Sequence, residues 1–304
     1  MSIFRHLVGV FALTYISINL TLGLIPLLIL ALLKLVIPLQ FVKDRIYQLM
    51  LGIYAFAVHV DSFLLKRLLG ITFDVVGLQN LDKRSNYLVI SNHRSWADIL
   101  ILQSLLINGA PIIKFIVKQE VIFIPLVGLI CWAYEYPFVK RSSLKDSGKS
   151  GKRLRDLSTI NQSLENLGNQ PTTIINFVEG TRFNLLKSKK TESPFPHLLK
   201  PRAGGLTYIL NTFGKDIDYV LDFTIAYDTE EPVFWNLMSG KCKRIKIEIK
   251  QIALKDLMQK FEINDNVIDY TSVSNWLKRF WQEKNDKLKI AYDDFRQQPV
   301  KHAS

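Results

Sequence analysis

The feature that most constrains this chain is an uncharged apolar segment near its amino terminus. No charged residue occurs between Leu7 and Leu33, and the apolar run Val36–Leu39 follows soon after Lys34. A helix of this length can cross a bilayer, whose hydrocarbon core needs about 20 apolar residues. The apolar run is too long for a signal peptide and has no clear small-x-small cleavage site. We therefore expect this segment to anchor the protein in a membrane.

Two arrangements of the anchor are open. Asn19, Gly23 and Pro26 interrupt the segment, so it is either one kinked spanning helix or a helical hairpin that enters one leaflet. A second apolar stretch, from Ile46 to His59, has basic residues on both sides, so the positive-inside rule does not choose an orientation. A pair of buried core helices is the alternative to membrane attachment. We assign residues 1–69 to membrane-anchoring helices and residues 70–304 to a second domain.

Composition limits the partners that this chain can have. The 304 residues carry a net charge of +12 together with 48% hydrophobic residues, which points to phospholipid surfaces or phosphate-bearing substrates. We expect no nucleic-acid partner, because the charge is dispersed and no reading motif occurs. Cys131 and Cys242 are the two cysteines, which excludes a disulfide framework and a cysteine-based metal site. A reducing compartment fits this usage.

After Gly70 the pattern changes to short strands that alternate with helices. This alternation predicts an α/β fold, in which a mixed, mostly buried β-sheet is flanked by helices. An amphipathic helix over Val273–Phe295 ends the domain, and we expect its aromatic residues to pack in a core or interface. The predicted strands are Ile71–Val76, Tyr87–Ile90, Ile112–Val117, Tyr134–Val139, Thr172–Val178, Tyr219–Ala226 and Lys243–Ile252, and the other helices are Trp96–Ile107, Asp146–Leu167 and Leu206–Phe213.

The first motif with chemical potential is Asn92-His93-Arg94-Ser95-Trp96-Ala97-Asp98, directly after a predicted strand. A histidine at the strand end and an aspartate at the helix start can meet across one turn. The carboxylate would then orient the imidazole and stabilise its protonated form, as a general base requires. The plainer interpretation is a helix N-cap aspartate beside a loop histidine, because this spacing also arises by chance.

A second motif, Phe177-Val178-Glu179-Gly180-Thr181-Arg182-Phe183, also follows a strand. Gly180 allows a tight turn, and the Arg182 guanidinium suits a phosphate, with Thr181 adding a hydroxyl. Glu179 could orient Arg182 or a substrate hydroxyl. A surface Glu–Arg pair in an ordinary turn is the alternative.

Two further polar clusters lie at element ends. Lys140 and Arg141 end the strand Tyr134–Val139, and Arg202 and Gly204 lie in Lys200-Pro201-Arg202-Ala203-Gly204-Gly205, just before a predicted helix. Helix amino termini can face an anion or an acyl carbonyl. Each cluster alone could be solvated charge, but ligands of open α/β sheets gather at one edge of the strands.

The order of these four blocks resembles the glycerolipid acyltransferase family, which contains 1-acyl-glycerol-3-phosphate acyltransferases. The resemblance covers roughly residues 87–226, and the His-x4-Asp and Glu-Gly-Thr-Arg blocks make it specific. It implies that His93 is the general base on a glycerol hydroxyl, with Asp98 orienting it. It also implies that Arg182, with Lys140 and Arg141, binds the acceptor phosphate, that Glu179 helps to position that arginine or the acceptor, and that Gly204 shapes the acyl site.

The resemblance further implies a lysophospholipid acceptor and an acyl donor that is acyl-CoA or acyl-carrier protein. No cofactor or metal is expected, and no side-chain cluster has metal-ligand spacing. A basic loop from Asn184 to Lys200 departs from the family pattern and is either a lid or a flexible insertion. Trp96-Ala97 and the long anchor look more like the lysocardiolipin and lysophosphatidylinositol acyltransferase subgroup.

We therefore predict a membrane-bound acyltransferase that converts 1-acyl-glycerol-3-phosphate to phosphatidic acid. Its predicted place is the bacterial inner membrane, with the catalytic domain on the cytoplasmic face. The alternative acceptors are lysophosphatidylglycerol, lysocardiolipin and lysophosphatidylinositol. A non-catalytic scaffold that binds anionic lipid is a rival from another class, which accounts for the charge and the anchor but not for the placement of His93 and Asp98.

Overall fold

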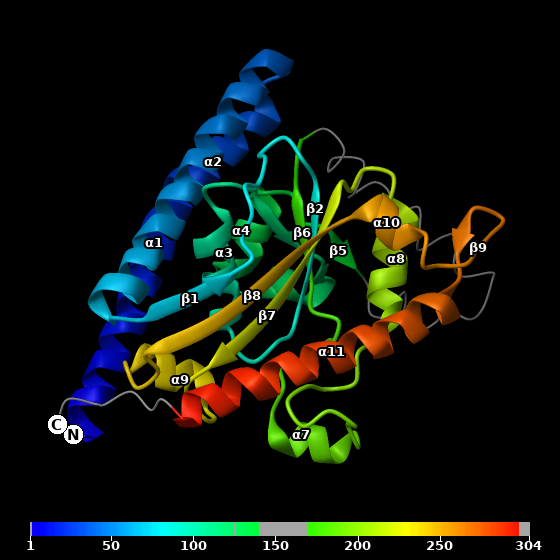
Figure 1. Ribbon diagram of the computed structural model, residues 1–304. Coiled ribbons are helices and arrows are strands. Elements are labelled where there is room, and N and C mark those ends of the chain that lie inside the picture. Colours follow the sequence, from blue (N-terminus) through cyan, green and yellow to red (C-terminus); the bar gives the residue numbers. More distant parts are fainter. Residues whose placement is uncertain (1, 125, 140–169, 298–304) are drawn as a thin grey trace.

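The chain begins with two long helices that form an antiparallel hairpin. The computed structural model describes residues 2–124, 126–139 and 170–297. Helix α1 (Ser2–Val36) continues through Gly23 and Pro26, and α2 (Gln40–Phe63) lies along it before ending in the π-helical turn η1 (Leu64–Leu68). In Figure 1 both helices, drawn in blue, run along one flank of the molecule. The apolar segment is thus one helix of a hairpin.

Most of the hairpin surface is exposed and apolar. Both helices are long and apolar enough to cross a membrane by length and composition, and only 22% and 28% of their most apolar windows are buried. The alternative of two buried core helices is therefore wrong. Asn19 is tolerated within α1 because its amide donates to the Ala57 carbonyl at 2.9 Å and to Asp61 at 2.8 Å, inside the hairpin.

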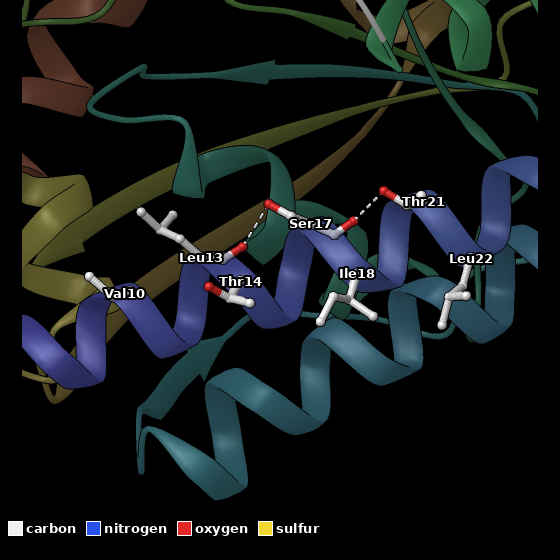
Figure 2. A pocket seen from close by; sticks show the side chains of 7 residues that line it. All are labelled: Val10, Leu13, Thr14, Ser17, Ile18, Thr21 and Leu22. Carbon is white, nitrogen blue, oxygen red and sulfur yellow. Dashed lines mark hydrogen bonds between the residues drawn. The ribbon is translucent and has the colours of Figure 1, made fainter.

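A shallow pocket on α1 is lined by both hydroxyl and aliphatic side chains, as Figure 2 shows. The Ser17 hydroxyl donates to the Leu13 carbonyl at 2.8 Å, and the Thr21 hydroxyl donates to the Ser17 carbonyl at 2.7 Å. These hydroxyls are satisfied within their own helix, so they are compatible with apolar surroundings.

The α/β domain is built on a six-stranded mixed sheet in the order β1-β8-β7-β2-β6-β3. Neighbouring strands are parallel except for β7 and β8, which are antiparallel. Parallel neighbours align the carboxyl ends of β2, β6 and β7 at one edge of the sheet. The strands are β1 (Thr72–Val76), β2 (Tyr87–Ser91), β3 (Ile113–Phe115), β6 (Thr173–Asn176), β7 (Tyr219–Tyr227) and β8 (Arg244–Ala253).

Helices cover both faces of this sheet (Figure 1), as predicted. One core joins the sheet to α8, α10 and α11, and the other joins it to α1, α3 and α9. Trp276 and Trp281 lie buried in the first core, which confirms that the aromatic residues of the terminal helix serve packing. The helices are α3 (Ala97–Leu106), α4 (Val127–Ala133), α7 (Leu185–Lys190), α8 (Ala203–Phe213), α9 (Val233–Met238), α10 (Leu254–Met258) and α11 (Tyr270–Gln297).

Some predicted elements differ from the structure. The strand expected over Ile112–Val117 divides into β3 and β4 (Val117–Lys118), because β4 pairs with β5 (Phe138–Val139) in a separate two-stranded sheet. The strand expected over Tyr134–Val139 is reduced to β5, since α4 and a turn at Glu135, whose φ is 57°, occupy its start. The remaining short elements are the 3-10 helix η2 (Gln119–Phe123), β9 (Ile263–Asn264) and β10 (Val267–Ile268). The helix expected over Asp146–Leu167 lies outside the described residues.

A buried ion pair fastens α11 to the sheet. The Lys284 ammonium contacts the Asp222 carboxylate of β7, and it also donates to the Phe223 carbonyl at 2.6 Å and the Thr224 hydroxyl at 3.2 Å. Lys284 is fully buried and Asp222 is nearly so. Removing one partner leaves an uncompensated buried charge, whereas replacing both with apolar groups can be neutral.

We expect Lys284→Met to lower the free energy of unfolding by about 3–5 kcal/mol, because it strands the Asp222 carboxylate in the core. The double variant Asp222→Leu/Lys284→Met should recover most of this loss. Urea unfolding followed by near-ultraviolet circular dichroism measures both. Lys287→Met, which breaks the more exposed pair with Glu248, is the matched control and should cost about 0–1 kcal/mol. An equal loss in all three variants would contradict this account.

Candidate active site

The site begins at the end of β2, where the side chain of Asn92 continues the hydrogen bonding of this strand with β7. The Asn92 side-chain amide donates to the Ile225 carbonyl of β7 at 2.9 Å, and its oxygen accepts from the Ile225 N–H at 2.9 Å. A side chain thus replaces the backbone at this point of the sheet. The backbone leaves the sheet here and presents His93 at its carboxyl edge.

His93 and Asp98 meet as their spacing predicts. The His93 Nδ1 lies 2.8 Å from the Asp98 carboxylate, whose side chain is fully buried, while 13% of the His93 side chain is exposed. Asp98 lies in the first turn of α3. Just before this turn, the Ser95 hydroxyl accepts a hydrogen bond from the Ala97 N–H at 2.8 Å. An acid behind a partly accessible imidazole is the geometry of a general base.

Further donors fix the Asp98 carboxylate. One oxygen accepts hydrogen bonds from the backbone N–H groups of Arg94 at 2.7 Å and Ser95 at 3.0 Å. The other oxygen accepts a hydrogen bond from the Tyr227 hydroxyl of β7. An ionised carboxylate only accepts hydrogen bonds, so His93 must donate from Nδ1. The network therefore assigns the free lone pair to His93 Nε2, the atom that can take a proton.

An aromatic ring backs the imidazole. The Phe177 ring stacks on His93 with a centroid distance of 4.0 Å and an interplanar angle of 16°. Phe115 of β3 lies behind Phe177 at 6.3 Å. Phe177 begins the second motif, but no local pattern predicts that its ring contacts His93 or that Tyr227 bonds to Asp98, because these contacts depend on the order of strands in the sheet.

The Glu179 side chain binds two backbone N–H groups from separate segments of the chain. Its oxygens accept from the His93 N–H at 2.9 Å and from the Leu199 N–H at 2.7 Å, so the carboxylate joins three segments of the chain. The sequence predicted that Glu179 positions Arg182 or the acceptor, whereas these bonds place it behind His93. Burial raises its pKa to about 8, against the lowering effect of the two backbone hydrogen bonds.

Gly180 brings the second and fourth motifs together. Its φ of +68° favours glycine, and a Cβ atom there would lie 3.5 Å from the Arg202 side chain. The Arg202 N–H also donates to the Val178 carbonyl at 2.7 Å. Helix α8 begins at Ala203, earlier than predicted, so Gly204 lies inside its first turn. Gly205 follows there and packs close to the side-chain amide of Asn176, where a Cβ atom would lie 3.6 Å away.

Cationic groups surround the exposed end of the second motif. The Arg182 guanidinium lies 4.7 Å above the ring of Trp96, in the loop that carries His93. The Lys187 ammonium of α7 donates to the Thr181 hydroxyl at 2.9 Å and to the Arg182 carbonyl at 3.1 Å. This lysine was noted in the sequence only as part of a basic loop. Lys140 and Arg141, which were also predicted here, lie outside the described residues.

The basic loop Asn184–Lys200 is partly built into the core. Asn184 caps α7 by accepting from the Lys187 N–H at 2.7 Å. Leu198 and Leu199 are buried, and the Trp281 indole donates to the Leu199 carbonyl at 3.1 Å. The second half of the loop therefore supports Glu179. Among residues 2–124, 126–139 and 170–297, no group of three or more His, Cys, Asp or Glu side chains could hold a metal ion.

Comparison with known proteins shows which family this arrangement belongs to. A family model described as Acyltransferase matches residues 72–226, just over half of the 304-residue chain. The chain therefore belongs to the acyltransferase family, which confirms the resemblance seen in the sequence.

Named relatives come from plants, animals and fungi. A Brassica napus protein named 1-acyl-sn-glycerol-3-phosphate acyltransferase 2 is 28% identical over 191 residues, covering 57% of this chain and 46% of that protein. The human 1-acyl-sn-glycerol-3-phosphate acyltransferase delta is 25% identical, with coverage of 66% and 52%. A Saccharomyces cerevisiae 2-acyl-1-lysophosphatidylinositol acyltransferase is 25% identical, with coverage of 69% and 62%. The chain spans about half the length of the first two relatives.

A solved structure shares the fold. The crystal structure of the 1-acyl-sn-glycerophosphate acyltransferase from Thermotoga maritima superposes with a TM-score of 0.55 and 16% identity. The match covers 94% of this chain and 98% of that one. The predicted fold, a mixed sheet flanked by helices and preceded by apolar helices, is confirmed.

The raised pKa of Glu179 predicts how stability changes with pH. The folded protein holds this proton up to about pH 8, whereas an unfolded chain releases it near the ordinary value of 4.5. The folded state thus binds more protons between these values, and this group's contribution to stability falls as pH rises through that window. Glu179→Gln removes the titration, so its pH dependence of unfolding should be flatter than that of the parent protein.

Urea unfolding at several values between pH 5 and pH 8 measures this effect. Glu283→Gln, on the exposed face of α11, is the matched control and should keep the parent pH dependence. A Glu179→Gln variant that tracks the parent protein across the whole window would refute the assignment.

Proposed function

We propose that this chain transfers a fatty acyl group from acyl-CoA or acyl-carrier protein to the free hydroxyl of 1-acyl-glycerol-3-phosphate, giving phosphatidic acid. The observation that carries the proposal is the 2.8 Å contact of His93 with the fully buried, multiply bonded carboxylate of Asp98. Family membership and the names of the plant and human relatives support the acceptor class.

The reaction needs only proton transfer at His93 in addition to substrate binding. Nε2 removes the proton of the acceptor hydroxyl as its oxygen attacks the thioester carbonyl carbon. Asp98 stabilises the positive imidazole through Nδ1. Collapse of the tetrahedral intermediate breaks the carbon–sulfur bond, and the imidazole returns the proton to the leaving thiolate. No covalent acyl-enzyme forms, so the ester product and a free thiol leave together.

The acceptor phosphate would bind at Arg182. Its guanidinium fork suits a phosphate, and Thr181 and Lys187 lie directly beside it. We extend the phosphate site to Lys140 and Arg141 from their place in the sequence alone. Gly180 adopts the positive φ that the backbone turn requires. Arg202 and Gly204, at the start of α8, are proposed to lie next to this turn.

A different acceptor of the same class is the second candidate. The yeast relative is named for lysophosphatidylinositol, and it matches a larger share of this chain than the plant relative does. Lysophosphatidylglycerol and lysocardiolipin belong to the same group of acceptors. All of them offer a glycerol hydroxyl to His93 and a phosphate to Arg182.

The hairpin favours attachment to a membrane. Helix α1 packs along the α/β domain at both ends: a Cβ atom at Gly9 would lie 2.9 Å from the Trp235 ring, and Lys34 pairs with Glu135 at 2.8 Å. A transverse orientation would draw the domain into the bilayer, so we propose that the hairpin lies within one leaflet. The cytoplasmic face suits both acyl donors, and the bacterial inner membrane stays a prediction.

The general base is tested by His93→Ala. We expect acyl-CoA-dependent thiol release with 1-acyl-glycerol-3-phosphate to fall by about 10²–10⁴-fold, the usual contribution of a positioned base. The backbone bonds of residue 93 to Glu179 and Phe183 remain, so the fold should persist. His59→Ala, at an exposed histidine of α2, is the matched control and should retain activity.

A His93→Ala protein with full activity would exclude His93 as the base. Absence of thiol release by the parent protein, with every lysophospholipid and both donors, would favour the scaffold that binds anionic lipid. Such a scaffold would keep its vesicle binding in the His93→Ala variant.

The phosphate role is tested by Arg182→Ala. We expect the acceptor KM to rise about 10–100-fold with little change in kcat, because a charge-assisted contact made in the ground state is lost. Lys190→Ala, at an exposed lysine of α7, should leave both constants unchanged. A large fall in kcat at constant KM would contradict ground-state phosphate binding.

A further inference from the structure

A second pocket of about 670 Å³ lies beside the His93–Asp98 pair. It is enclosed by the loop after β7, the carboxyl end of α11 and the segment around α7, which gather at one end of the molecule in Figure 1. Two of its lining residues, Arg94 and Tyr227, also hold the Asp98 carboxylate. The pocket therefore shares a wall with the candidate active site.

Two residues that line this pocket are sequence neighbours of residues with proposed roles in the site. Arg94 lines the pocket and directly follows His93, the proposed base. Phe183 lines it and directly follows Arg182, the proposed phosphate ligand, and its N–H donates to the His93 carbonyl at 2.7 Å. These contacts place the pocket close to both sites, and we infer that a group attached to the acceptor phosphate extends toward it.

Two residues that line the pocket carry buried polar atoms without partners among the described residues. The Arg94 guanidinium lies 4.5 Å above the Phe183 ring and 5.7 Å from the Tyr292 ring. The Nε atom of Arg94 and the hydroxyl of Tyr292 are buried, and neither has a hydrogen-bond partner in the described part of the chain. Buried polar groups in proteins are nearly always hydrogen-bonded, and a hydroxylated ligand in the pocket would supply partners for these two.

The charges around the pocket balance, which argues against a bare anion as the ligand. The cationic side chains are matched by carboxylates, and burial together with nearby Arg94 lowers the pKa of His197, which keeps its ring neutral at pH 7. A charge-balanced pocket attracts no net charge. The cations are Arg94, Lys241 and Arg296, and the carboxylates are Asp228, Glu230 and Glu231.

Hydroxyl groups suit such a lining. A hydroxyl both donates and accepts, so it can accept from Arg94 and donate to a carboxylate in the same pocket. Asp228 already accepts from the backbone N–H groups of Lys243 and Arg244, which leaves Glu230 and Glu231 at the rim for this purpose. The partly exposed ring of Tyr292 can cover a C–H face of a polyol.

We propose that this pocket binds a polyhydroxylated head group, glycerol-like or inositol-like, that is carried on the acceptor phosphate. The inference rests on the proposed function, since it takes the acceptor to be a lysophospholipid bound at His93 and Arg182. An acceptor with a bare phosphate, such as 1-acyl-glycerol-3-phosphate, would use the same base without filling the pocket.

Two variants test the pocket without touching the proposed catalytic groups. Tyr292→Phe keeps the ring against Arg94 and removes only the unpartnered hydroxyl, and Glu231→Gln weakens an exposed acceptor at the rim. The full chain in detergent micelles is assayed by thiol release with lysophosphatidylinositol, lysophosphatidylglycerol and 1-acyl-glycerol-3-phosphate. We expect the KM for the first two acceptors to rise about 3–10-fold in each variant, as loss of one hydrogen bond implies.

The KM for 1-acyl-glycerol-3-phosphate should stay constant, and Glu283→Gln is the matched control for all three acceptors. Unchanged constants for every acceptor, or an equal rise for all of them, would overturn the pocket assignment. Inhibition by inorganic phosphate that disappears in Tyr292→Phe would also overturn it, in favour of an anion site.

A binding measurement separates this proposal from the proposed function. Calorimetric titration of the full chain with glycerophosphoinositol, which has no acyl chain, should give weaker binding in Tyr292→Phe than in the parent protein. This result would support the pocket even if no acceptor were turned over, whereas absent turnover would refute the proposed function alone. No heat of binding to the parent protein would overturn the pocket proposal.

Discussion

The buried carboxylate of Asp98 is the constraint on which the site depends. It accepts hydrogen bonds from the His93 imidazole, from two backbone N–H groups of the same loop and from the Tyr227 hydroxyl. An ionised group with no exposure is tolerable only with such a set of donors. These bonds join the end of β2, the start of α3 and the end of β7, so the position of the His93 imidazole depends on how this edge of the sheet is assembled.

Glu179 and Lys284 extend the same principle to the opposite side of the site. Glu179 holds the His93 backbone to Leu199, and Lys284 ties α11 to Asp222 of β7. Glu179 is a buried acid whose pKa burial raises to about 8, and Lys284 is a buried ammonium paired with Asp222. Both groups gain their hydrogen-bond partners only when distant segments have docked. The polar framework therefore selects one arrangement of the helices around an otherwise apolar core, and it leaves the imidazole accessible at the edge.

Local patterns predicted much of the fold. The strands at residues 72–76, 87–91, 219–227 and 244–253 and the helices at 97–106 and 270–297 agree with runs of apolar and β-branched residues or with helical periodicity. The short strands β3, β4 and β5 were less predictable, because the break after residue 115 depends on pairing: β3 pairs with β6 in the main sheet, whereas β4 and β5 pair with each other in a separate sheet. The early start of α8 was missed because Gly204 and Gly205 disfavour helix locally, whereas the structure includes both glycines in the first turn of this helix.

The sequence by itself determined the two apolar helices, the α/β alternation and the spacing of His93 and Asp98, because each depends on residues close together in the chain. Only the tertiary structure decided that Tyr227 and Phe177 contact the His93–Asp98 pair, that Glu179 binds the His93 backbone, and that Arg94 lines a second pocket. Those contacts follow from the strand order β7-β2-β6, which brings together segments more than 80 residues apart through hydrogen bonds between strands that no local pattern specifies.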